Sequence, residues 1–129
     1  MTKSRPRPGG EFKVALVGCG RISRNHFEAL RKIDGLTLTA VCDVVPERAK
    51  AAAEQEGVAS FMSYEEMLKR ADCDVVSVCT PSGLHAAQGA LAARSGKHVV
   101  TEKPMAITLG QADELVKACD DAGVFLFVV

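Results

Sequence analysis

The sequence predicts an α/β fold with a doubly wound, mostly parallel sheet and helices on both faces. Two observations carry this prediction: apolar segments of strand length recur along the chain, and segments with helical periodicity separate them. Strands joined by helices must pair in parallel, through right-handed crossovers. We therefore expect residues 11–129 to form one layered domain, preceded by a flexible tail at residues 1–10.

Apolar segments with the length of strands are bounded by glycine, proline or polar turn residues. They lie at residues 12–17, 36–42, 59–62, 75–79, 98–101 and 124–129. The first and fourth are apolar without alternation, which is typical of strands that a parallel sheet buries on both faces. The sequence thus places strands at regular intervals from one end of the domain to the other.

The segments between these strands carry helix signals. They lie at residues 21–33, 46–56, 63–70, 84–94 and 108–122. The first has apolar residues at helical spacing, and His26 lies on that face. The second has a proline in its first turn, where a helix tolerates it. The third and fifth open with the capping boxes Ser63-x-x-Glu66 and Thr108-x-x-Gln111.

Residues 14–23, V-A-L-V-G-C-G-R-I-S, form the most informative stretch, because a strand enters a glycine turn and a helix follows at once. Gly18 permits the tight turn, and Gly20 lets the backbone approach a phosphate closely. The N–H groups and dipole of the new helix then face the anion. Ser23 holds the third position of this fingerprint, normally Gly or Ala. The pattern predicts a Rossmann-type dinucleotide site, and the alternative is a turn that merely joins strand to helix.

Asp43 ends the second strand about 20 residues after the glycine turn, where a carboxylate binds the hydroxyls of a ribose. Its charge would repel a 2′-phosphate, and Val44 and Val45 supply no cation to offset that repulsion. Arg48 is the nearest cation in sequence. We therefore expect NAD rather than NADP.

Composition narrows the classes of function. Hydrophobic residues make up 47% of the 129 and charged residues 25%, as in ordinary globular domains. Lys and Arg equal Asp and Glu at 16 each, so no net basic field predicts nucleic acid or an anionic membrane as partner. No apolar run approaches the ~20 residues of a membrane span. The basic, Pro/Gly-rich residues 1–10 lack the apolar segment of a signal peptide, and residual tag sequence is an alternative reading.

The cysteines form neither a C-x-x-C pair nor a zinc-ligand spacing. They are Cys19, Cys42, Cys73, Cys79 and Cys119. Most fall in apolar strand or helix contexts. We expect free, buried thiols in a reducing cytoplasm and no metal site.

The loop Thr80-Pro81-Ser82-Gly83-Leu84-His85 follows the fourth strand, at the sheet edge where ligands bind in such folds. Pro81 makes the exit rigid, and Ser82 or its backbone is expected to face the nicotinamide half of the cofactor. A simple helix entry is the alternative. His85 is expected either to pack or cap the helix, or to contact cofactor or substrate.

The loop Glu102-Lys103-Pro104-Met105 follows the fifth strand. An acid and a lysine at the end of an apolar strand are costly to bury without partners. Beside a cationic nicotinamide and a sugar hydroxyl, a lysine can help to move a proton. A surface salt bridge explains the same residues equally well.

The motifs V-G-C-G-R-I-S-x-x-H, V-C-D, T-P-S-x-x-H and E-K-P-M, in this order and spacing, resemble the N-terminal half of the glucose–fructose oxidoreductase and inositol dehydrogenase (Gfo/Idh/MocA) family. The resemblance covers about residues 12–129. More narrowly, the chain resembles the bacterial UDP-N-acetyl-2-amino-2-deoxyglucuronate dehydrogenases. This narrower resemblance implies NAD-dependent oxidation of a UDP-linked sugar at C3. It also implies a homo-oligomer formed through a C-terminal substrate domain that this chain lacks.

The resemblance assigns roles to residues of all these loops. Those expected to bind cofactor are Gly18, Gly20, Arg21, Ile22, Asp43, Thr80, Pro81, Ser82, His85, Glu102 and Lys103. Lys103 is also the expected catalytic lysine. Two alternatives stay open: another dehydrogenase of the family, acting on inositol or a simple hexose, and a non-catalytic dinucleotide-binding module.

Overall fold

The computed structural model describes residues 10–129, so the expected tail lies outside the described residues except for Gly10. The strands are β1 (Phe12–Val17), β2 (Leu36–Cys42), β3 (Ala59–Phe61), β4 (Val75–Val78), β5 (His98–Thr101) and β6 (Leu126–Val128). The helices are α1 (Ser23–Lys32), α2 (Pro46–Glu56), α3 (Tyr64–Arg70), α4 (His85–Arg94) and α5 (Leu109–Ala122), with a 3-10 turn, η1 (Ser82–Leu84), before α4.

The strands form one sheet in the order β3-β2-β1-β4-β5-β6, and every pairing is parallel. The chain starts in the centre at β1, moves to one edge through β2 and β3, and returns to β4 before moving to the other edge. The order reverses between β1 and β4, which is where such sheets open a crevice for ligands. The predicted doubly wound, Rossmann-type fold is confirmed.

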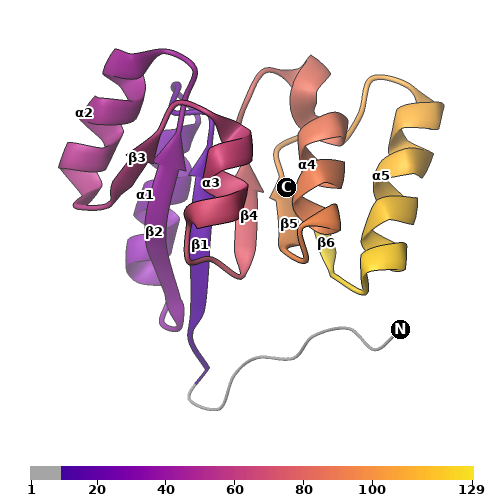
Figure 1. Cartoon of the computed structure of the whole chain (residues 1–129), viewed down its shortest axis with the longest axis horizontal. Coiled ribbons are helices and arrows are strands. Elements are labelled where there is room, and N and C mark those ends of the chain that lie inside the picture. The colour runs from indigo at the N-terminus through magenta and orange to yellow at the C-terminus, as the bar shows by residue number, and fades with distance from the viewer. Residues whose placement is uncertain (1–9) are drawn as a thin grey trace.

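Side chains alternate between two cores, one on each face of the sheet, as the period of a strand requires. Leu16 and Val41 pack with Phe27 of α1 and Ala53 of α2. The larger core lies on the other face, where residues of β1, β2, β4 and β5 pack beneath α3, α4 and α5. Figure 1 shows these three helices on one side of the sheet and α1 behind it.

The strand-six boundary differs from the expected one. The backbone N–H of Val124 donates to the carbonyl of Cys119 at 3.0 Å, which closes the end of α5. The N–H of Phe125 donates to Nδ1 of His98 at 3.0 Å. The carbonyl of Phe125 still accepts from the N–H of Val99 in β5 at 3.0 Å. The two N–H groups donate outside the ladder, and paired residues begin at Leu126.

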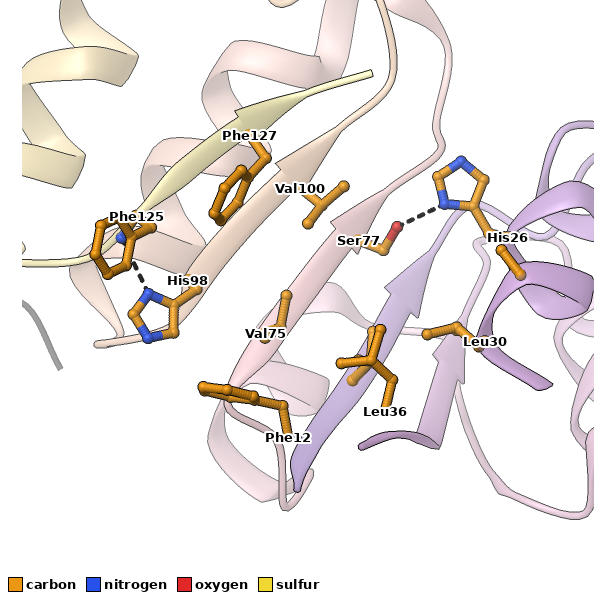
Figure 2. Close-up of a pocket in the computed structure, with 12 residues that line it drawn as sticks. Phe12, His26, Leu30, Leu36, Val75, Ser77, His98, Val100, Phe125 and Phe127 are labelled. Atoms are coloured by element: carbon orange, nitrogen blue, oxygen red, sulfur yellow. Dashed lines mark hydrogen bonds between the residues drawn. The ribbon is translucent and has the colours of Figure 1, made fainter. Parts of the chain in front are cut away.

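An open apolar groove of about 440 Å³ lies beside α1, on the face of the sheet opposite α4. Its lining includes Phe12, Val75, Val100 and Phe127, and Figure 2 shows these side chains along the strands. An aromatic row crosses it, with ring centroids 6.1 Å apart between Phe12 and His98. None of the helices formed by residues 10–129 combines the length and apolarity needed to cross a membrane.

Candidate functional site

Gly18 and Gly20 serve different purposes in the turn after β1. Gly18 has a φ of +95°, and a Cβ on it would lie 2.6 Å from the backbone carbonyl carbon of Cys79. A Cβ on Gly20 would meet nothing within 4 Å. Gly18 therefore lets β1 and β4 approach each other, and Gly20 keeps space open at the start of α1.

The start of α1 has backbone N–H groups that could bind an anion. No side chain caps this helix, and the backbone N–H groups of Gly20, Arg21 and Ile22 have no acceptor within residues 10–129. The buried Ser23 donates its hydroxyl to the carbonyl of Gly20 at 2.6 Å, so this residue fits the third fingerprint position without an unsatisfied polar atom. Open space and free N–H groups together suit a pyrophosphate.

Asp43 is only 8% exposed and ties two loops together. Oδ2 accepts from the backbone N–H of Cys19, and Oδ1 accepts from that of Val45, each at 2.8 Å. Each carboxylate oxygen keeps further acceptor capacity for a ribose hydroxyl. The sequence indicated the ribose contact but not this structural bond to the glycine turn, because the two residues meet only when β1 and β2 pair.

Two thiols lie beside this carboxylate. Burial, and then the charge of Asp43, raises the pKa of the Cys19 thiol to about 12 and that of Cys42 to about 11. Both groups are therefore protonated near neutral pH and are weak nucleophiles. Cys42, Cys73, Cys79 and Cys119 are buried, and Cys19 is partly exposed.

The loop after β4 exposes Pro81 and Ser82 but buries His85, which is 2% exposed. Nδ1 of His85 lies 2.8 Å from the carbonyl oxygen of Pro104, and Nε2 lies 2.6 Å from that of Thr80. Both ring nitrogens are thus directed at the protein's own backbone rather than at a ligand. Of the two expectations for His85, the structure favours the packed histidine.

The loop after β5 holds Glu102 and Lys103 in contrasting surroundings. Oε1 of Glu102 lies 2.8 Å from Nε2 of His26, and both side chains are largely buried. Lys103 is exposed and has no hydrogen-bond or ion-pair partner among the described residues. The salt bridge that was the alternative explanation of this lysine is therefore not formed within residues 10–129.

The loops that the sequence singles out lie at one edge of the sheet, at the carboxyl ends of the adjacent strands β2, β1, β4 and β5. His26 is the functional candidate that sequence reasoning missed, because its spacing placed it on the apolar face of the helix. The only signal for it is its place in the motif V-G-C-G-R-I-S-x-x-H.

Comparison with known proteins assigns the chain to a family. The model of an oxidoreductase family with an NAD-binding Rossmann fold, GFO_IDH_MocA, matches residues 12–129. The chain belongs to this family. The resemblance read from the motifs is confirmed, and NAD is the cofactor of the Gfo/Idh/MocA domain to which the chain corresponds.

Individual relatives are longer than this chain. D-apiose dehydrogenase of Paraburkholderia graminis is 41% identical over 118 residues, which are 91% of this chain and 32% of the relative. WlbA dehydrogenase from Bordetella pertussis, solved with NADH and UDP-GlcNAcA, is 45% identical with a TM-score of 0.90, over 92% of this chain and 37% of that one.

The WlbA dehydrogenase from Chromobacterium violaceum, also solved with NADH and UDP-GlcNAcA, is similar over the whole of this chain. It has a TM-score of 0.95 and 45% identity, and the match covers 38% of that protein. The Gfo/Idh/MocA chain described here thus spans about a third of the length of these relatives.

Proposed function

We propose that this chain is the cofactor domain of an NAD-dependent dehydrogenase that oxidises a UDP-linked N-acetylglucosaminuronate at C3 of the sugar. The single observation that supports this most strongly is the 45% identity, over the whole chain, to a dehydrogenase solved with NADH and UDP-GlcNAcA. Since this chain spans about a third of such relatives, the substrate would bind mainly to a further domain. Homo-oligomer formation through that domain is part of the proposal.

The residues at the sheet edge fit the cofactor. The glycine turn and the free N–H groups of α1 would hold the pyrophosphate, and Asp43 would bind the adenosine ribose. Thr80, Pro81 and Ser82 would line the nicotinamide side, with Glu102 nearby. NAD, when bound, supplies a hydride acceptor.

Lys103 would orient the reacting sugar hydroxyl. Its ammonium is exposed at the end of β5 and is not paired within residues 10–129, so it is available to a substrate. A cation there favours the alkoxide that develops as carbon gives its hydride to NAD, and the hydroxyl proton would pass to a base in the further domain. A non-catalytic dinucleotide module would have no use for an unpaired lysine at this place.

Substitution of Lys103 tests the proposal in the full-length protein. We expect Lys103→Ala to lower kcat by roughly 10²–10⁴, the usual scale for a positioned proton-transfer group, while the Kd of NAD changes little. Lys103→Arg would not restore kcat, because the guanidinium group is larger and planar and its charge is delocalised, so it does not replace the compact ammonium. Lys117→Ala, at an exposed lysine of α5, is the matched control. Near-normal kcat in Lys103→Ala would overturn the catalytic role.

A different substrate within the family is the second candidate. The observation in its favour is the 41% identity to D-apiose dehydrogenase. Initial rates of NADH formation with UDP-GlcNAcA, D-apiose and myo-inositol separate the two. A kcat/KM that is highest for UDP-GlcNAcA supports the UDP-sugar, and a higher value for D-apiose replaces it.

A further inference from the structure

Two largely buried histidines from different helices hold the residues on either side of Lys103. His26 of α1 contacts the side chain of Glu102, and His85 of α4 contacts the carbonyl of Pro104. Lys103 itself has no partner within the described residues. Its position is therefore set by what holds Glu102 and Pro104.

His26 joins three elements of the fold. Nε2 lies 2.8 Å from Oε1 of Glu102, and Nδ1 lies 3.0 Å from Oγ of Ser77 in β4. Figure 2 shows the His26 ring directed at the Ser77 hydroxyl, at one end of the apolar groove. A neutral ring satisfies both contacts, because Nε2–H donates to the carboxylate and Nδ1 accepts from the hydroxyl. The helix that follows the glycine turn is thereby connected to the loop after β5.

Some hydrolases use a serine hydrogen-bonded to a histidine that in turn contacts a glutamate, as Ser77, His26 and Glu102 do here. Ser77, however, is not placed for nucleophilic attack. It lies inside β4, it is 3% exposed, and the ladders of β1 and β5 flank it. Backbone N–H groups within paired strands are not free to form an oxyanion hole. The contacts of His26 therefore indicate positioning rather than hydrolysis.

His85 joins the loops after β4 and β5. Its two neighbours, the carbonyl oxygens of Thr80 and Pro104, are both acceptors. The ring donates to both of them only when both nitrogens carry a proton. Because the side chain is 2% exposed, water does not replace a lost contact readily.

We propose that His26 and His85 are positioning residues that fix Lys103 relative to the cofactor site. His26 holds the loop from the side of α1, and His85 holds it from the side of the loop after β4. The proposal rests on the catalytic role proposed for Lys103. A displacement of about 1 Å in such a group can lower the rate on the order of 10²-fold. Two contacts that hold the loop of Lys103 in place therefore protect the rate.

Asparagine and glutamine substitutions separate the two nitrogens of each ring. The asparagine amide falls near the place of Nδ1, and the glutamine amide falls near that of Nε2. At position 26 the contact to Glu102 uses Nε2, so His26→Gln preserves it and His26→Asn removes it. At position 85 the contact to Pro104 uses Nδ1, so His85→Asn preserves it and His85→Gln removes it.

The proposal predicts that the glutamine variant has the higher kcat at position 26 and that the asparagine variant has the higher kcat at position 85. We expect His26→Gln and His85→Asn to keep kcat within about threefold, and His26→Asn and His85→Gln to lose about ten- to a hundredfold, with little change in the Kd of NAD. If the two histidines only fill space, the ranking of Asn and Gln variants is not expected to reverse between the two positions. Equal kcat within each pair, or the reverse order, would overturn the proposal.

A second measurement needs neither cofactor nor turnover. Acetic anhydride labels exposed lysines, and mass spectrometry gives the labelling rate of Lys103 relative to that of Lys117 in the same molecule. We expect this ratio to change in His26→Asn and His85→Gln and to match the parent in the other two variants. A ratio that is the same in all four variants contradicts positioning.

Thermal unfolding of each variant shows whether it folds. Where a His85 variant does not fold, nitrogen NMR of the parent tests the contact to Pro104: a hydrogen-bonded proton on Nδ1 supports it, and an Nδ1 without a proton overturns it. Failure of the positioning role can be distinguished from failure of the proposed function. If Lys103→Ala keeps kcat, the function fails, whereas if Lys103→Ala loses kcat but the histidine pairs do not separate, only the positioning role fails.

Discussion

The carboxylate of Asp43 accepts a hydrogen bond from the backbone N–H of Cys19 at 2.8 Å, and this contact joins the end of β2 to the glycine turn after β1. The residue expected to bind the ribose therefore also holds the glycine turn in place. Substitutions of Asp43 must be read with both roles in mind, because a loss of binding can come from either.

Replacement of Asp43 by asparagine should narrow the preference for NAD over NADP. Asn keeps one acceptor oxygen but loses the charge that repels a 2′-phosphate. Arg21, Arg24 and Arg48 line a pocket of about 550 Å³ beside Cys19 and Gly20, so cations are close. We expect NAD binding to weaken by about 1–3 kcal/mol, the scale for a charge-assisted bond, and the NAD/NADP ratio of Kd values to shift toward NADP.

Calorimetric titration of Asp43→Asn with both cofactors measures this shift, and Asp113→Asn on the exposed part of α5 serves as the control. An unchanged ratio would show that Asp43 does not discriminate between the two cofactors. Asp43→Ala should also lower the unfolding midpoint, because it leaves the N–H groups of Cys19 and Val45 without their acceptor.

The two glycines of the turn should fail in different ways. Gly18→Ala places a Cβ 2.6 Å from backbone atoms of Cys79 and Thr80, just after β4, at a positive φ, so we expect a large drop in the unfolding temperature. Gly20→Val enters open space in the free protein, but its side chain would occupy the place expected for the pyrophosphate. Its unfolding temperature should stay near that of the parent while NAD binding is abolished. Unfolding of Gly20→Val would contradict the assignment of this space to the cofactor.

Stability should fall at alkaline pH. Burial raises the pKa of Cys19 and Cys79 from 9.0 to about 12 and that of Cys42 to about 11. The unfolded chain loses these protons at lower pH than the folded one. The stabilisation is therefore complete below about pH 9 and is lost as pH rises toward about 12.

Urea unfolding between pH 8 and pH 11, with reductant present, measures this loss. The urea midpoint should decline above pH 9, and the decline should be shallower in Cys79→Ala, because one of the buried thiols is removed. A midpoint that is level or rising over this range would show that the thiols do not control alkaline stability.

The apolar groove beside α1 should make the 129-residue chain self-associate. Contiguous apolar surface left open to solvent often marks a contact surface. Sedimentation velocity should show association that increases with concentration. Phe127→Ser, within the groove, should reduce it, whereas Leu109→Ser, at an 85% exposed residue outside the groove, should not. A parent chain that is monomeric at high concentration would contradict this.

Local signals in the sequence were sufficient for most of the fold. Ser63 and Thr108 accept bonds from the N–H groups of Glu66 and Gln111, as their capping boxes predict, and Gly123 ends α5 in a left-handed conformation. Such contacts join residues a few positions apart, so the type of residue is enough to indicate them. The place of the glycine turn and of the loops after β4 and β5 then follows from the general rule for parallel sheets.

Only the tertiary structure decided what the individual side chains do at that edge. His26 and Glu102 are 76 residues apart in sequence, and His85 and Pro104 are 19 apart. Neither contact has a local signal, because each depends on how two packed elements bring their ends together. The sequence by itself thus determined the strands, the helices and the edge of the sheet at which the cofactor is expected to bind. Packing of helices against the sheet determined that His85 faces the backbone and that Lys103 is left without a partner within residues 10–129.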